Sequence, residues 1–308
     1  MILDGWGNSS NPKVSAIDHA NTPFIDSLYK KYPFATLRTD GLHVGLPEGQ
    51  MGNSEVGHMN LGAGRIVYQD LVKVNLAVKN KTLNTEKVLV DAFNYAKTNN
   101  KDVHFLGLLS DGGVHSHITH LFGLLEAAND FGLKNTYVHA FTDGRDVDPK
   151  SGLGFLTQLE SHLKNTNSKL ATVTGRYFAM DRDKRWERVK IAYDAVVNSV
   201  GEKSTNVTET VKKSYNNEVT DEFIKPIIMV DDSGNPVAKI KDGDVVIFFN
   251  FRTDRGRELT EALTQTDFHE QNMHKLDLHY VTLTNYDDTY KNIKVICLLC
   301  PRLWKKRS

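Results

Sequence analysis

The chain has 308 residues, enough for two domains, and its 38 Lys and Arg residues balance 38 Asp and Glu residues. This balance argues against nucleic-acid binding, because no basic excess is present to neutralise phosphates. No apolar run reaches membrane-spanning length, no signal peptide is visible, and one Cys297/Cys300 pair makes neither a disulfide framework nor a complete zinc site. We therefore expect a soluble, cytoplasmic protein that binds neither nucleic acid nor membrane.

The first apolar residues, 1–3, predict the end of a buried strand that begins upstream and runs into a glycine-rich loop. Asp4 follows at the strand's carboxyl end, where open α/β sheets place ligand-binding groups. It could equally start a tight turn before Gly5. Further on, Thr-Pro at the start of residues 22–32 predicts a helix, and short extended pieces are expected at 34–37 and 42–46.

Residues 49–58, GQMGNSEVGH, form a glycine-rich turn in front of an apolar periodic run. Ser54 is predicted at the N-cap of the following helix, and Gly52 would allow close approach of the backbone. A hydroxyl there would feel the positive end of the helix dipole, beside N–H groups that can bind an anion. Ser54 is therefore either a phosphate acceptor or simply a helix cap. A P-loop is excluded because no Lys follows the glycines at the required spacing.

After residues 66–72, where we place a domain boundary, helical patterns at 71–78 and 85–97 lead into a regular alternation. Four strands are predicted, each followed by a polar loop and a helix, and a further strand is predicted at 278–284. The four strands are 103–109, 136–141, 170–173 and 245–250; their helices are near 117–129, 152–163, 184–197 and 255–263. This order predicts an α/β fold with a mostly parallel sheet covered on both faces.

The loops after these four strands carry similar chemistry. If the sheet is parallel, they meet at its carboxyl edge and form one crevice. Their candidate residues are His115, Arg145, Asp146, Arg176, Arg182, Arg252 and Arg255. Five guanidinium groups together would bind a phosphate and a carboxylate. A single arginine, taken alone, is more simply interpreted as a solvent-exposed residue in a surface ion pair.

Two other features of these loops are weaker candidates. Arg185 and Arg188 lie in a charged helix start, and we expect them to have structural roles. His115, His117 and His120 invite a metal interpretation, but too few well-spaced ligands surround them for a zinc site.

Several long motifs together resemble one known family, the cofactor-independent (2,3-bisphosphoglycerate-independent) phosphoglycerate mutases of the alkaline-phosphatase superfamily. The matching runs cover about residues 1–290. They are LDGWG (3–7), MGNSEVGHMNLGAGR (51–65), LLSDGGVHSH (108–117), TDGRDVDP (142–149), GRYFAMDRDKRWERV (175–189) and FFNFRTDRGREL (248–259).

The resemblance implies an α/β fold in which a partial alkaline-phosphatase-like domain carries an inserted α/β transferase domain. Residues 1–68 would form the N-terminal part of the phosphatase-like domain, and 69–287 would form the inserted transferase domain. Residues 288–308 would begin the chain's return to the phosphatase-like domain and end in an aberrant tail. The implied reaction interconverts 3-phosphoglycerate and 2-phosphoglycerate through a phosphoserine intermediate. The implied partner is this small-molecule substrate, and we expect a monomer.

The resemblance also assigns roles to residues. Ser54 would be the nucleophile, Asp4 and Ser54 would ligate one of two Mn²⁺ ions, and Asp146 would carry protons for the glycerate hydroxyls. The substrate would be held by His115, Arg145, Asp146, Arg176, Arg182, Arg252 and Arg255.

The end of the chain departs from the family pattern. After residue 295 the sequence matches nothing expected, and the family's later Asp, His and Lys motifs are missing. We therefore expect a C-terminal truncation, arising from a frameshift or fragmentary gene model, and no mutase activity from this chain. The alternatives are a metal-dependent phosphatase of the same superfamily or a non-catalytic phosphoglycerate-binding fragment.

Overall fold

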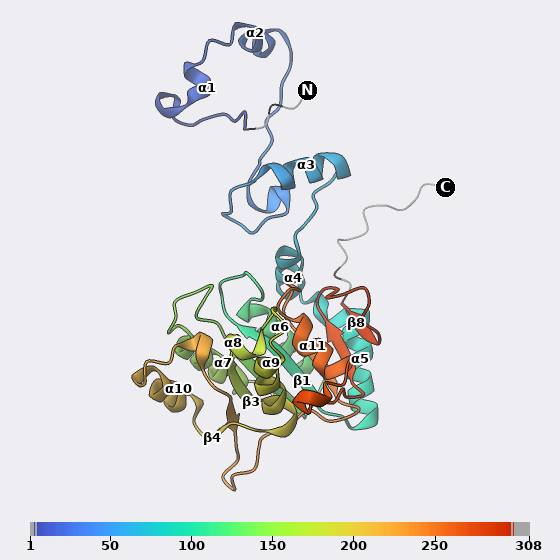
Figure 1. The fold of residues 1–308 in the computed structure, drawn as a ribbon. Helices are drawn as coiled ribbons and strands as arrows, with labels where there is room; N and C mark the ends of the chain where they lie inside the picture. Colours follow the sequence, from blue (N-terminus) through green and yellow to red (C-terminus); the bar gives the residue numbers. More distant parts are fainter. Residues whose placement is uncertain (1–2, 4, 297, 299–308) are drawn as a thin grey trace, which may run out of the picture. The chain divides into compact units, whose positions relative to one another are not determined.

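The structure is a computed structural model, in which residues 3, 5–296 and 298 are described (Figure 1). Asp4, Cys297 and Cys300 lie outside the described residues. The chain divides into two compact units, Met1–Val72 (unit 1) and Lys73–Ser308 (unit 2). The predicted functional domains, 1–68 and 69–287, remain predictions. Within the described residues, no helix combines the length and apolar character needed to cross a membrane.

Unit 1 consists of short helices around a small core. They are η1 Pro12–Val14, α1 Ala16–His19, α2 Pro23–Lys31, η2 Gly41–Val44, α3 Ser54–Ala63 and the start of α4 Asp70–Lys79. Its buried hydrophobic cluster comprises Val44, Leu46 and Val56. The predicted helix at 22–32 is confirmed. The extended piece expected at 42–46 is wrong, because a 3₁₀ helix ending at left-handed Gly45 turns the chain there.

Unit 2 contains an eight-stranded sheet in the order β4-β5-β3-β2-β1-β6-β7-β8. Its pairings are parallel except that of β3 with β5. The strands are β1 Val103–Leu109, β2 Thr136–Thr142, β3 Ser168–Gly175, β4 Glu202–Ser204, β5 Ile227–Met229, β6 Val245–Phe248, β7 His279–Thr282 and β8 Ile293–Val295. The predicted α/β class and mostly parallel sheet are confirmed.

Helices cover both faces of this sheet, and each face has its own core (Figure 1). One layer comprises α4, α5 Lys87–Asn99, α6 Ile118–Asp130, α7 Gly152–Leu163 and α10 Val207–Asn216. The other comprises α8 Arg176–Ala179, α9 Trp186–Tyr193 and α11 Arg257–Thr264. Strand β1 contributes side chains to both cores, since Phe105 packs in the first and Leu106 in the second. Its continuous burial explains why the sequence there is apolar apart from the buried His104.

Short elements connect these layers. They are η3 Thr82–Thr85, the π turn η4 Asp194–Asn198, η5 Asp221–Phe223 and η6 His269–Gln271. The turn η5 packs tightly on the end of β3, because a Cβ on Gly175 would lie 2.4 Å from the Glu222 carbonyl oxygen. Only glycine permits that approach, which brings Glu222 next to the loop after β3.

The parallel register gathers the carboxyl ends of the central strands at one edge. Leu109 at the end of β1 pairs with Thr142 at the end of β2, and Thr142 pairs with Gly175 at the end of β3. Phe248 ends β6 opposite Leu106. The four loops that follow these strands therefore start side by side, as the predicted crevice requires.

Candidate functional site

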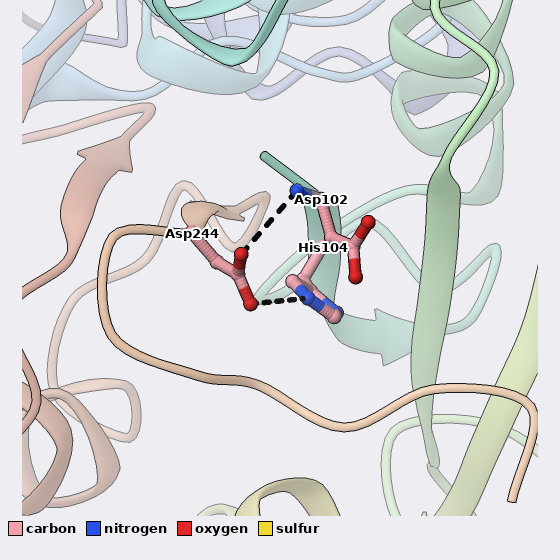
Figure 2. A group of neighbouring side chains, drawn as sticks. All are labelled: Asp102, His104 and Asp244. Carbon is pink, nitrogen blue, oxygen red and sulfur yellow. Dashed lines mark hydrogen bonds and ion pairs between the residues drawn. The ribbon is translucent and has the colours of Figure 1, made fainter. Parts of the chain in front are cut away.

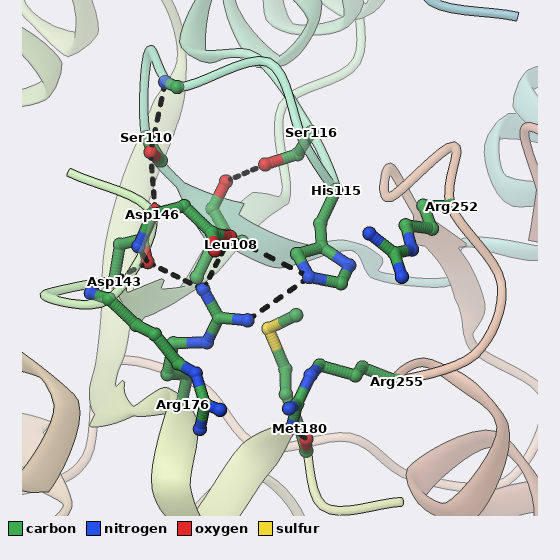
Figure 3. Close-up of polar contacts among 12 residues, drawn as sticks. Leu108, Ser110, His115, Ser116, Asp143, Asp146, Arg176, Met180, Arg252 and Arg255 are labelled. Atoms are coloured by element: carbon green, nitrogen blue, oxygen red, sulfur yellow. Dashed lines mark hydrogen bonds and ion pairs between the residues drawn. The ribbon is translucent and has the colours of Figure 1, made fainter.

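Arg176 is the centre of a buried polar cluster at this sheet edge (Figure 3). It is the first residue of α8 and only 2% exposed. Its Nη1 donates to Asp143 Oδ1 and to Asp146 Oδ2, each at 2.6 Å, and its Nη2 donates to His115 Nε2 at 3.1 Å. The loops after β1, β2 and β3 each supply a member. The structure thus brings together the predicted residues His115, Asp146 and Arg176.

Asp143, which the sequence analysis did not select, organises the loop after β2. Its Oδ1 accepts the backbone N–H groups of Arg145 at 3.2 Å and Asp146 at 3.0 Å, and its Oδ2 accepts the Ser110 hydroxyl at 2.6 Å. Burial alone would raise the pKa of Asp143, but these hydrogen bonds and the Arg176 charge lower it below its usual value. Asp143 is therefore an ionised anchor that orients Arg145 and Asp146.

His115 is held as a neutral imidazole. Its Nε2 accepts a hydrogen bond from Arg176, so the ring proton resides on Nδ1. Burial, followed by the Arg176 charge, lowers the pKa of His115 to about 4. Its Nδ1 faces Asp254 Oδ1 at 3.7 Å, and its Nε2 lies 3.6 Å from Asp146 Oδ2. The ring therefore lies between two carboxylates without itself being charged at neutral pH.

Asp254 joins the remaining arginines and was also missed from the sequence. Its Oδ1 lies 3.0 Å from Arg252 Nε, and its Oδ2 accepts from Arg182 Nη1 at 3.1 Å and Arg252 Nη2 at 3.2 Å. Burial would raise the pKa of Asp254, but Arg252, His115 and Arg182 lower it. One carboxylate thus holds Arg182 and Arg252 close to His115.

A cavity of about 380 Å³ opens between these loops. Four of the five predicted arginines line it, and Arg188, for which we expected only a structural role, lines it too. The lining residues are Arg145, Arg176, Arg182, Arg188, Arg255, Tyr177, Met180, Asp181, Asp183, Glu222 and Phe223. We call this cavity the arginine crevice. Such a concentration of guanidinium groups suits an anionic ligand.

Arg255 shows how crowded this positive charge is. Its Nη1 donates to the Met180 carbonyl oxygen at 3.0 Å. Burial lowers the pKa of Arg255, and Arg176, Arg182 and Arg145 lower it further by repulsion. A bound anion would relieve that repulsion.

Ser54 belongs to unit 1, at the start of α3. The predicted N-cap is wrong by one position, since Asn53 caps the helix by accepting the Val56 N–H at 3.0 Å and Ser54 is the first helical residue. Asn caps as well as Ser does, so the cap position was ambiguous in the sequence. Ser54 is exposed, with its Oγ 3.2 Å from His58 Nδ1. Its hydroxyl still lies at the positive end of a helix.

The glycine before this turn is required for packing. A Cβ on Gly52 would lie 1.8 Å from the Thr39 carbonyl oxygen. Gly52 thus fixes the entry to the α3 turn, which agrees with the close backbone approach expected there.

A group that could hold a metal ion lies at the other edge of the sheet (Figure 2). Asp102 and Asp244 immediately precede β1 and β6, and His104 is the second residue of β1; their ligand atoms lie within 4.8 Å of one another. His104 Nε2 is 3.4 Å from Asp244 Oδ2, and its Nδ1 is 3.0 Å from His139 Nε2. This group could not be found from the sequence, because Asp244 lies 140 positions after His104 in the chain. Asp244 also accepts two backbone N–H groups, so the same atoms close the loop before β6.

Comparison with known proteins shows to which family the chain belongs. Residues 74–288 match the family model described as the N-terminus of BPG-independent PGAM. A 2,3-bisphosphoglycerate-independent phosphoglycerate mutase from Flavobacterium psychrophilum is 72% identical over 96% of this chain, and one from Bacteroides fragilis (strain ATCC 25285) is 52% identical over 96%. The chain spans 59% and 58% of these relatives, respectively.

A solved structure is similar in fold. The crystal structure of Leishmania mexicana phosphoglycerate mutase at low cobalt concentration matches with a TM-score of 0.71 and 34% sequence identity. The match covers 89% of this chain and 52% of that one.

Proposed function

Because the chain belongs to the 2,3-bisphosphoglycerate-independent phosphoglycerate mutase family, we propose that its arginine crevice binds phosphoglycerate. The observation that carries the proposal is the convergence of Arg145, Arg176, Arg182 and Arg255 on one cavity. A phosphoglycerate presents a phosphate and a carboxylate, both of which pair with the guanidinium fork. The proposed reaction is the interconversion of 3-phosphoglycerate and 2-phosphoglycerate.

Different residues hold the ligand and move protons: the first line the crevice, whereas Asp146 lies beside it, bound to the lining residue Arg176. Arg255 and Arg182 bind its anionic groups, whereas Arg176 keeps Asp146 in place. The Asp146 side chain is 18% exposed, so it can accept a proton from one glycerate hydroxyl and return it to the other oxygen. Neutral His115 keeps its place between the carboxylates without adding charge.

Phosphoryl transfer is proposed to use Ser54. The Ser54 Oγ–phosphorus bond forms as the ester bond to the glycerate oxygen breaks, and the reverse step returns the phosphoryl group to the other hydroxyl. Ser54 Oγ is an exposed oxygen at a helix N-terminus, and such an oxygen can be one ligand of a hard cation. The other proposed ligand, Asp4, lies outside the described residues. Mn²⁺ bound by Asp4 and Ser54 would lower the hydroxyl pKa and neutralise phosphate charge.

Truncating Arg255 tests phosphoglycerate binding. Arg255→Ala is expected to weaken binding of 3-phosphoglycerate by roughly 2–3 kcal/mol, the scale of a charge-assisted pair in a partly buried site. Calorimetric titration of the 308-residue chain measures this, with Arg185→Ala as an exposed arginine control. Equal affinities of the Arg255 variant and the unaltered chain would contradict the proposal.

Testing the role of Ser54 requires an experiment that detects transfer of the phosphoryl group. In a chimera that places these residues in the longer Flavobacterium psychrophilum relative, Ser54→Ala is expected to lower turnover by at least about 10³-fold, because no other hydroxyl would receive the phosphoryl group. Phosphopeptide mapping after substrate trapping should find the label on Ser54. Label elsewhere, or full turnover by the variant, would eliminate this role. Net release of inorganic phosphate instead of isomerisation would favour the metal-dependent phosphatase alternative.

A further inference from the structure

Two carboxyl groups, Asp181 in the lining of the arginine crevice and Glu258 outside that lining, hold one turn, residues 181–185. Glu258, in the first turn of α11, is 6% exposed and accepts the Lys184 N–H at 2.8 Å. Asp181 is 4% exposed, and its Oδ2 accepts the N–H groups of Asp183 at 2.9 Å and Arg185 at 3.0 Å. The backbone of this turn is therefore fixed from two sides by acidic side chains.

The turn carries a ligand-facing arginine in a conformation that needs support. Arg182 lines the crevice, and Lys184 adopts a left-handed φ of 56°. A non-glycine residue in that region is strained, so the hydrogen bond from the Lys184 N–H to Glu258 stabilises the turn at its weakest point. Disturbing Glu258 would therefore displace Arg182 without touching the ligand.

We propose that Glu258 and Asp181 share one proton and act as positioning residues for Arg182, so that the crevice binds phosphoglycerate more weakly once this proton is lost. The inference rests on the proposed function of the crevice and adds a pH response to it. Glu258 does not line the crevice, and Asp181 acts in this inference through the backbone N–H groups that it holds.

The surrounding charges explain why one proton is retained. Arg188 Nη1 lies 3.3 Å from Asp181 Oδ1, while Asp183 repels a second negative charge, and burial, together with acidic neighbours that include Glu258, raises the pKa of Tyr290. Glu258 Oε2 is buried without a hydrogen-bond partner among the described residues. Burial, together with Asp181 and Asp183, raises the pKa of Glu258 to about 7. Burial also opposes ionisation of Asp181, but its backbone N–H donors and the neighbouring Glu258 and Arg188 lower its pKa. The proton therefore resides on Glu258 and is lost as the pH rises through neutrality.

The central experiment compares the unaltered chain with Glu258→Gln, whose amide imitates the protonated carboxyl group. Calorimetric titration with 3-phosphoglycerate is made at several pH values from about 6 to about 8.5. We expect equal affinities near pH 6 and about threefold to tenfold tighter binding by the variant near pH 8.5. The ratio of the two affinities cancels the titration of the phosphate itself. A ratio that stays constant over this range would overturn the inference.

Two further measurements separate this inference from the proposed function. Infrared difference spectra of the unliganded chain should show a protonated-carboxyl band that disappears near pH 7 and is absent from Glu258→Gln. Asp181→Asn should move that disappearance to lower pH, because the neighbouring negative charge is gone. Absence of the band would refute proton sharing even if the crevice binds phosphoglycerate. Failure of every variant to bind phosphoglycerate, with the band present, would refute only the function of the crevice and its coupling to the pair.

Discussion

Replacing Arg176 with methionine is expected to lower the free energy of unfolding of unit 2 by about 3–5 kcal/mol, the scale for removing one partner of a buried charge pair. Arg176 is 2% exposed and Asp143 is 1% exposed, so water cannot replace the lost guanidinium group. The methionine keeps the apolar stem but leaves Asp143, Asp146 and His115 without their common donor. Urea denaturation followed by circular dichroism measures the loss.

The matched control for this prediction is Arg185→Met, an exposed arginine whose change should stay within about 0.5 kcal/mol. Adding Asp143→Asn to the Arg176 variant should recover part of the loss, since the uncompensated buried charge is then removed. If both single arginine variants are equally stable, the cluster around Arg176 contributes nothing specific to unit 2.

Acid should destabilise unit 2 mainly through buried histidine. His120 is fully buried in α6, with Nε2 2.7 Å from Asn75 Oδ1, and burial followed by the nearby His117 lowers its pKa to about 3. Because the pKa of His120 is lower in the folded state than in the unfolded state, folding favours the neutral ring. The stability of unit 2 is therefore unaffected by this group above about pH 6.5 and falls as the pH drops toward 3. From this shift in pKa, we expect protonation of His120 to lower the free energy of unfolding by about 2–3 kcal/mol between pH 7 and about 4.5. His115 adds to it in the same direction.

Urea denaturation at these two pH values, with His120→Gln as the comparison, checks this account. The glutamine amide can still donate to Asn75 but does not titrate, so the variant should lose less stability on acidification. Equal losses in the two proteins would mean that burial of His120 does not govern the acid response. The same comparison near pH 7 separates any packing defect of the variant from its titration.

The strand pattern could be predicted because parallel strands buried on both faces leave continuous apolar runs. Strand β1 was located at its exact residues, and β2 within one residue. The three-residue strands β4, β5 and β8 were missed, since so few residues carry no periodicity. The fold class therefore followed from the long central strands alone.

The crevice could be predicted only in part. Arg145, Arg176, Arg182 and Arg255 converge as expected, because each follows a strand of one parallel sheet. Of the acidic residues around them, Asp146 was selected from the sequence, but Asp143, Asp254 and Glu258 were not. Asp143 stands before a glycine, as many turn residues do, and Glu258 lies in the first turn of a helix, where carboxylates are common. Their importance depends on burial and on contacts between distant positions, such as Lys184 with Glu258 across 74 positions, which local pattern does not encode.

A crystal structure of the 308-residue chain with 3-phosphoglycerate would show whether the arginine crevice is a phosphoglycerate site. We expect the phosphate and carboxylate to pair with arginines among Arg145, Arg182 and Arg255, with Arg176 still bound to Asp143. A ligand bound elsewhere, or a crevice left empty at saturating ligand, would contradict this expectation.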